Sequence, residues 1–62
     1  KLTKSSVEFA NGKKLLIRDG GWYKLQSLYD EAGRWVKSKL RYYKGRQVVK
    51  EMRSYNNANQ MD

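Results

Sequence analysis

In the segment 35–42, Trp35 is followed at every second position by a basic residue, namely Lys37, Lys39 and Arg41. If this segment is a β-strand, Lys37, Lys39 and Arg41 project from one face, and mostly apolar residues project from the other. Cations two residues apart on a strand lie about 7 Å from each other, which is close to the phosphate spacing along one nucleic-acid strand. The chemistry that this segment favours is therefore the binding of a polyanion.

The composition argues against catalysis. The 62 residues include no histidine, cysteine or proline, which excludes disulfides, the usual zinc ligand sets and imidazole chemistry, and leaves a serine nucleophile without an ordinary base. Asp19, Asp30 and Glu31 lie in or beside expected turns, where carboxylates commonly accept local backbone hydrogen bonds. Gly20 and Gly21 lack the spacing of a phosphate-binding loop. We therefore expect a protein that is not an enzyme, needs no cofactor or metal and has no small-molecule substrate.

The charge balance points to an anionic partner. Fourteen lysine and arginine residues against six aspartate and glutamate residues give a formal net charge of +8. Such an excess favours nucleic acid or an anionic membrane, and a merely soluble basic surface is the plain alternative. No apolar run approaches the ~20 residues that span a bilayer, and residues 1–6 lack the apolar core of a signal peptide. We therefore expect a cytoplasmic, nucleoid-associated protein without membrane contact. Because the sequence opens on Lys1, we also expect it to belong to a longer chain, with a downstream catalytic domain as one option.

Hydrophobic periodicity predicts three strands, over residues 13–18, 22–29 and 34–43. Residues 19–21 and 30–33 supply turns between them, so the strands should follow one another in an antiparallel meander. Residues 1–12 are expected to form a flexible basic arm, with at most one docked strand.

The last third of the chain has a different period. Apolar residues recur there at i, i+1, i+4 and i+7, which is typical of one stripe of a helix. They are Val48, Val49, Met52 and Tyr55. Residues 58–62 are expected to fray. The predicted fold class is therefore α+β, with a three-stranded antiparallel β-meander packed on one C-terminal α-helix in a domain of residues 13–57.

The predicted helix would cover one face of the sheet and leave the other bare. The covered face would carry Leu15, Ile17, Tyr23, Leu25, Tyr29, Val36, Leu40 and Tyr42. The bare face would carry the residues predicted to contact DNA, which are Lys14, Arg18, Trp22, Lys24, Gln26, Trp35, Lys37, Lys39 and Arg41. On such a face cations pair with phosphates, Arg and Gln read base edges and rings add apolar contacts, so the sheet could dock in the major groove of double-stranded DNA. The plain alternatives are lysines that guard a strand against edge aggregation and tryptophans that pack in a core or against a neighbouring domain.

Four segments together resemble the amino-terminal arm-type DNA-binding domains of tyrosine recombinases, the integrases of phages and conjugative transposons. They are 17–24 (IRDGGWYK), 29–34 (YDEAGR), 37–39 (KSK) and 43–52 (YKGRQVVKEM). The resemblance implies a three-stranded sheet that is backed by a carboxy-terminal helix and lies in the major groove, while a separate catalytic domain cleaves the DNA. It also implies base and phosphate readers at Lys24, Gln26, Lys37, Lys39 and Arg41.

A second likeness is to short β-repeat proteins. Residues 9–15, 29–36 and 55–61 look like three imperfect copies of an aromatic-x-x-Asn/Ala-Gly-basic-x-apolar unit. Under that interpretation the last third of the chain would be strand.

Two other binding modes stay open. One is a protein-interaction module that exposes Trp22, Leu28 and Trp35 as one apolar patch. The other is a binder of single-stranded nucleic acid that uses Trp22, Trp35 and Tyr43 as stacking platforms.

Overall fold

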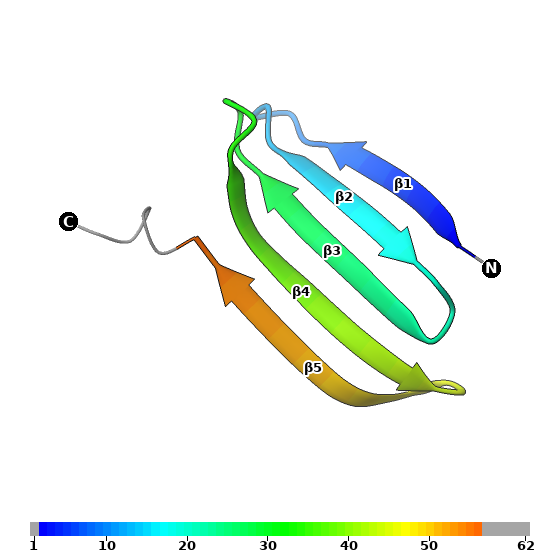
Figure 1. Cartoon of the computed structure of the whole chain (residues 1–62). Coiled ribbons are helices and arrows are strands. Elements are labelled where there is room, and N and C mark those ends of the chain that lie inside the picture. The colour runs from blue at the N-terminus through cyan, green and yellow to red at the C-terminus, as the bar shows by residue number, and fades with distance from the viewer. Residues whose placement is uncertain (1, 57–62) are drawn as a thin grey trace.

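The computed structural model describes residues 2–56 and arranges them as one sheet of five antiparallel strands (Figure 1). The strands are β1 (Thr3–Glu8), β2 (Lys14–Asp19), β3 (Tyr23–Tyr29), β4 (Trp35–Lys44) and β5 (Gln47–Tyr55). Each strand pairs with the next along the chain, so their order in the sheet is their order in the sequence. The fold is an up-and-down meander, and residues 2–56 contain no helix.

The predicted C-terminal helix is wrong, because its residues form β5. This strand lies along β4, with Met52 opposite Leu40 and Glu51 opposite Arg41. A bulge at Val49, where β5 has one residue more than β4, breaks the alternation that a regular strand would show. The bulge accounts for the adjacent apolar residues Val48 and Val49, and the spacing from Met52 to Tyr55 arises because these two side chains lie on opposite faces of the strand. The fold class is all-β and not α+β.

Residues 3–8, which we expected in a flexible basic arm, form β1. They pair with β2 over their whole length, from Thr3 opposite Asp19 to Glu8 opposite Lys14. Every residue of β1 is exposed, so backbone pairing with β2 places this strand and side-chain packing contributes little. The tail predicted to fray, residues 58–62, lies outside the described residues.

Two loops with the same backbone hydrogen bonds lie at the same end of the sheet (Figure 1). In loop 9–13 the N–H of the first residue donates to the carbonyl of the last (2.8 Å), and the N–H of Gly12 donates to the carbonyl of the first (3.0 Å). Loop 30–34 repeats both bonds, each 2.9 Å long. Gly12 and Gly33 occupy the same position, with φ of 90° and 84° that only glycine adopts readily. The β-repeat likeness predicted strand in the last third of the chain, and residues 47–55 form one.

The turn between β2 and β3 decides which residues share a face. The N–H of Gly20 donates to the carbonyl of Tyr23 (3.0 Å), so only two residues lie at the corner. With a two-residue corner, each odd-numbered residue of β2 faces an even-numbered residue of β3. Leu15 and Ile17 therefore lie on the face opposite to Tyr23, and the predicted covered face is wrong at these two positions. The ring of Tyr23 packs against Gly20 so closely that a side chain at position 20 would overlap it. The corner in this form therefore requires glycine there.

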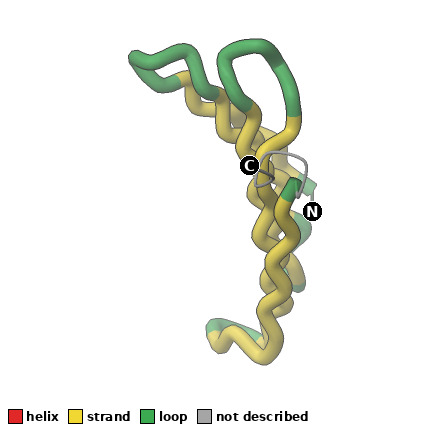
Figure 2. The backbone as a smooth tube through the Cα atoms, turned by 90° about the vertical axis from the view of Figure 1, so that its left-hand side faces the viewer, coloured by secondary structure: helices red, strands yellow, loops and turns green. Residues whose placement is uncertain are grey.

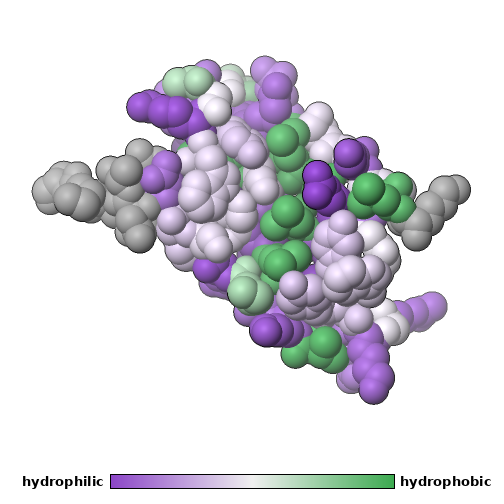
Figure 3. Space-filling model, in the orientation of Figure 1, coloured by the Kyte–Doolittle hydropathy of each residue, from purple (hydrophilic) through white to green (hydrophobic). Residues whose placement is uncertain are grey.

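The register divides the strands into two faces of different chemistry. The cationic face carries Thr3, Ser5, Val7, Leu15, Ile17, Asp19, Lys24, Gln26, Leu28, Lys37, Lys39, Arg41, Glu51, Arg53 and Tyr55. The aromatic face carries Lys4, Ser6, Glu8, Lys14, Leu16, Arg18, Tyr23, Leu25, Ser27, Tyr29, Trp35, Ser38, Leu40, Tyr42, Lys50, Met52 and Ser54. Figure 3 looks onto the aromatic face, where hydrophobic side chains form a stripe with pale side chains beside it.

Within residues 2–56, no second layer covers either face. Figure 2 shows the sheet nearly on edge, as a single twisted layer of strands. None of the residues 2–56 is buried, and the half-buried side chains concentrate in the central strands β3 and β4. The predicted core between sheet and helix does not form, because the residues that were to make the helix extend the sheet.

Candidate functional site

Three neighbouring strands bring basic side chains together on the cationic face. Lys24 and Gln26 come from β3, and their cross-strand partners Arg41 and Lys39 come from β4. β5 adds Arg53 opposite Lys39. Neighbouring strands lie about 4.8 Å apart, and alternate residues along one strand about 7 Å apart. These positions therefore form a two-dimensional array of positive charge.

The structure divides the nine residues predicted to contact DNA between the two faces. Five share the cationic face, namely Lys24, Gln26, Lys37, Lys39 and Arg41. Four lie on the aromatic face, namely Lys14, Arg18, Trp22 and Trp35. The lysine and arginine of β2 lie there because the two-residue corner sets the phase of that strand. Trp35 lies there because Val36 is the extra residue of a bulge. Trp35 and Lys37 therefore project from opposite faces, although they are two residues apart.

Both tryptophans are engaged by neighbours on the aromatic face. Trp22 stacks on Tyr42, with ring centroids 5.7 Å apart and planes inclined by 15°. The indole N–H of Trp35 donates to the hydroxyl of Ser38 (2.7 Å). Leu28 lies on the other face, so the predicted apolar patch of Trp22, Leu28 and Trp35 is not contiguous.

β5 contributes two residues of the cationic face that the sequence pattern did not single out, Arg53 and Tyr55. The helical interpretation missed them, because residues two apart in a helix point in different directions, whereas in a strand they project from the same face. A signal was present, since Glu51, Arg53 and Tyr55 alternate with Met52 and Ser54 at a period of two.

The cationic face is hollowed in its middle. The hollow encloses about 220 Å³. It is lined by Leu15, Gln26, Leu28, Lys37, Ser38, Lys39, Arg53 and Tyr55. Apolar side chains, one amide, one phenol and three cations thus meet in one place, which suits a ligand with both an apolar and an anionic part.

Glu51 forms hydrogen bonds with two arginines of the cationic face, one on β4 and one on β5. Its Oε1 accepts a hydrogen bond from Nε of Arg41 (3.0 Å), and its Oε2 accepts one from Nε of Arg53 (2.8 Å). The bond from Arg53 is the first cause that holds the pKa of Glu51 below its usual range. The pKa of Arg53 is raised in turn, first by Glu51 and then by a hydrogen bond with the side chain of Tyr55. Arg53 therefore connects a fixed carboxylate to the phenol at the rim of the hollow.

The lysines of β4 carry charge that no carboxylate neutralises. Within residues 2–56, Lys37 and Lys39 make no ion pair, whereas Nζ of Lys24 lies 4.0 Å from the carboxylate of Asp19. On this face the cations without a paired carboxylate therefore line the hollow. Lys14, Arg18 and Lys50 on the aromatic face likewise make no ion pair within residues 2–56.

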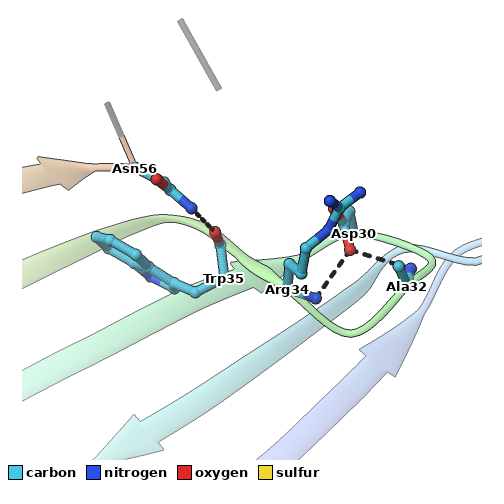
Figure 4. A network of polar contacts seen from close by, with 5 residues as sticks. All are labelled: Asp30, Ala32, Arg34, Trp35 and Asn56. Atoms are coloured by element: carbon cyan, nitrogen blue, oxygen red, sulfur yellow. Dashed lines mark hydrogen bonds and ion pairs between the residues drawn. The ribbon is translucent and has the colours of Figure 1, made fainter. Parts of the chain in front are cut away.

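Two of the three turn carboxylates, Asp19 and Asp30, accept backbone hydrogen bonds, as the sequence predicts. Asp30 Oδ1 accepts hydrogen bonds from the N–H groups of Ala32 (3.0 Å) and Arg34 (2.8 Å), and its Oδ2 accepts one from Nε of Arg34 (3.2 Å; Figure 4). The backbone bond from Arg34 is the first cause that lowers the pKa of Asp30. Asp19 Oδ1 accepts from the N–H of Gly21 (2.9 Å). The described part of the chain holds no group of three or more side chains suited to a metal ion.

Comparison of the chain with known protein families, characterised proteins and solved structures finds no match. No helix in residues 2–56 is long and apolar enough to cross a membrane. The case for a function therefore depends on the chemistry of the cationic face.

Proposed function

We propose that this chain is a non-catalytic module whose cationic face binds the phosphate backbone of nucleic acid. The observation that carries the proposal is the pair Lys37 and Lys39, which make no ion pair within residues 2–56, with Arg53 opposite Lys39 on the next strand. Cations that neutralise phosphates release counterions from the polyanion, and this release drives binding. A net charge of +8 supports the same class of partner.

The sheet is wider than the major groove of DNA, and this limits how it can contact a duplex. The major groove is about 12 Å wide and admits a two-stranded ribbon, whereas five strands about 4.8 Å apart span about 19 Å. Contact across the phosphates therefore fits this sheet better than insertion of the whole sheet into the groove. The likeness to integrase arm-binding domains stays a prediction from sequence motifs, and the helix that it implied is a strand here.

Substitution of Lys39 tests the proposal. Lys39→Ala should weaken binding to a short oligonucleotide and reduce the slope of log affinity against log salt by about one unit, because one phosphate contact is lost. Binding would be followed by fluorescence anisotropy between about 50 and 200 mM salt.

Lys14→Ala is the matched control, since it removes one lysine from the aromatic face. It should leave the salt slope nearly unchanged. Equal effects of the two substitutions would overturn the assignment to the cationic face, and no binding by the unaltered chain at low salt would overturn the proposed function.

A further inference from the structure

The hollow of the cationic face combines two kinds of surface in adjacent rows of the sheet. One cross-strand row consists of Leu15, Leu28, Lys37 and Tyr55, and the next consists of Ile17, Gln26, Lys39 and Arg53. The first row is apolar at Leu15 and Leu28 and aromatic at Tyr55, with the cation of Lys37 between Leu28 and Tyr55, whereas the second is mostly polar and charged. A nucleotide has the matching pair of surfaces, a base with two apolar faces and an anionic phosphate.

We propose that this hollow holds one unpaired nucleotide of a single-stranded nucleic acid, with its base against Leu28 and Tyr55 and its phosphate at Lys37 or Lys39. This inference rests on the proposed function, because the phosphates bring the strand to the face. Beyond the proposed function, it states that the hollow contacts a base as well as the phosphates, and that only an unpaired base can enter the hollow.

The size of the hollow favours one unit of a polymer over an isolated small molecule. Its volume of about 220 Å³ is below the ~300–1,000 Å³ of typical small-molecule sites, which enclose most of their ligand. A site this small and open gains affinity when neighbouring contacts hold the rest of the ligand. The surrounding cations offer such contacts to the flanking phosphates.

Tyr55 is suited to stacking by its exposure and its place on β5. Its relative exposure is 47%, so its ring can meet a base. It lies two residues after Arg53 on the same face of the strand, and Glu51 holds Arg53 through a hydrogen bond of 2.8 Å. An arginine that is ordered before binding loses less conformational entropy when it pairs with a phosphate.

Gln26 adds a group that can bond to a base edge. Its amide offers both a donor and an acceptor, and it lies on β3 opposite Lys39 and lines the same hollow. In a duplex the Watson–Crick edge of a base is occupied and its faces are stacked on neighbours. Only an unpaired base presents both its edge and its faces to a flat sheet.

The experiment compares three ligands of equal length on the unaltered chain at one fixed salt concentration. They are a single strand of mixed sequence, its duplex, and an abasic sugar-phosphate strand. Stacking on an aromatic side chain predicts that the single strand binds about 5- to 150-fold more tightly than the abasic strand. Equal affinity for these two strands would overturn the inference and leave the proposed function intact. Failure of all three ligands to bind would instead overturn the proposed function.

Substitutions at Tyr55 locate the effect. Tyr55→Ala should remove most of the advantage of the base-bearing strand, and Tyr55→Phe should keep it because the ring remains. Trp22→Ala is the matched control, since it removes an exposed aromatic ring from the opposite face and should preserve the advantage. Loss of the advantage in Trp22→Ala but not in Tyr55→Ala would move the base site to the aromatic face and overturn the inference. Far-UV circular dichroism verifies that each variant keeps the sheet.

Discussion

Asp30 and Glu51 show what single carboxylates do in this molecule. Asp30 holds its own loop through two backbone N–H groups and the guanidinium of Arg34, and Glu51 holds the guanidinium groups of Arg41 and Arg53. Both have pKa values below the usual range, because the folded chain supplies donors to the ionised form. These two acids therefore stabilise the fold or arrange the site, and neither has the raised pKa expected of a general acid.

Replacing Asp30 should change how stability depends on pH. In the unaltered chain the stabilisation by ionised Asp30 is full above the ordinary carboxyl pKa of about 4, and it is lost as the pH falls through the lowered pKa. Asp30→Asn should therefore lower the unfolding midpoint at neutral pH and make the midpoint fall less in acid. The measurement is thermal unfolding from about pH 7 to about pH 2.

Glu31→Gln serves as the control for Asp30→Asn, because it removes a carboxylate from the same loop without removing any of the hydrogen bonds that Asp30 accepts. The same pH response in both variants would contradict the role given to Asp30.

At the scale of strands, position in the sheet separates the centre from the edges. β2, β3 and β4 have a paired strand on both sides, whereas β1 and β5 have one. The end of β5 is pinned to β4 by Asn56, whose Nδ2 donates to the carbonyl of Trp35 (2.8 Å; Figure 4) and whose N–H donates to that of Val36 (2.9 Å). This matters for the site, because Arg53 and Tyr55 belong to β5.

Amide hydrogen exchange should follow this arrangement. Amides of β3 and β4 should exchange most slowly, and those of β1 fastest among the strands, with about a tenfold difference for each ~1.4 kcal/mol of extra opening free energy. The residue-resolved rates are measurable by NMR after transfer to D₂O. Strongest protection in residues 47–55 with weak protection in β4 would contradict the sheet order, because such a pattern belongs to an independent helix.

At the scale of the whole molecule, residues 2–56 form a single layer in which no residue is buried. None of the residues 2–56 is buried, so the apolar contribution to stability comes from partly covered side chains in the central strands. Large apolar residues stay exposed, including Trp22 at 63% and Val49 at 58%. A net charge of +8 adds repulsion within this thin body.

The chain by itself should consequently have a low free energy of unfolding. We expect a value at or below ~5 kcal/mol, the lower end of the range for natural domains, and a shallow dependence on urea because little surface is newly exposed. Urea titration followed by circular dichroism measures both quantities. A clearly higher value at concentrations where the chain is shown to be monomeric would contradict the single-layer description.

Several features of this fold could be predicted from local periodicity. The expected strands at 13–18, 22–29 and 34–43 agree with β2, β3 and β4 to within about one residue. The turn expected at 19–21 lies instead at residues 21 and 22, and this shift changes the face on which the side chains of β2 lie relative to β3. The shared face of Lys24, Gln26, Lys37, Lys39 and Arg41 was likewise predictable, since alternation along β3 and β4 fixes it. Their role in binding stays a prediction.

The sequence by itself determined the composition, with its net charge of +8 and its lack of histidine and cysteine. It also determined properties that depend on near neighbours, namely the alternation along the central strands and much of the turn chemistry. The tertiary structure alone decided that residues 47–55 pair with β4, that Lys14 and Arg18 lie opposite the other predicted cations, and that Arg53 and Tyr55 join the site. The physical reason is that strand pairing and register depend on distant partners. One bulge or one two-residue corner reverses the side on which every following side chain lies.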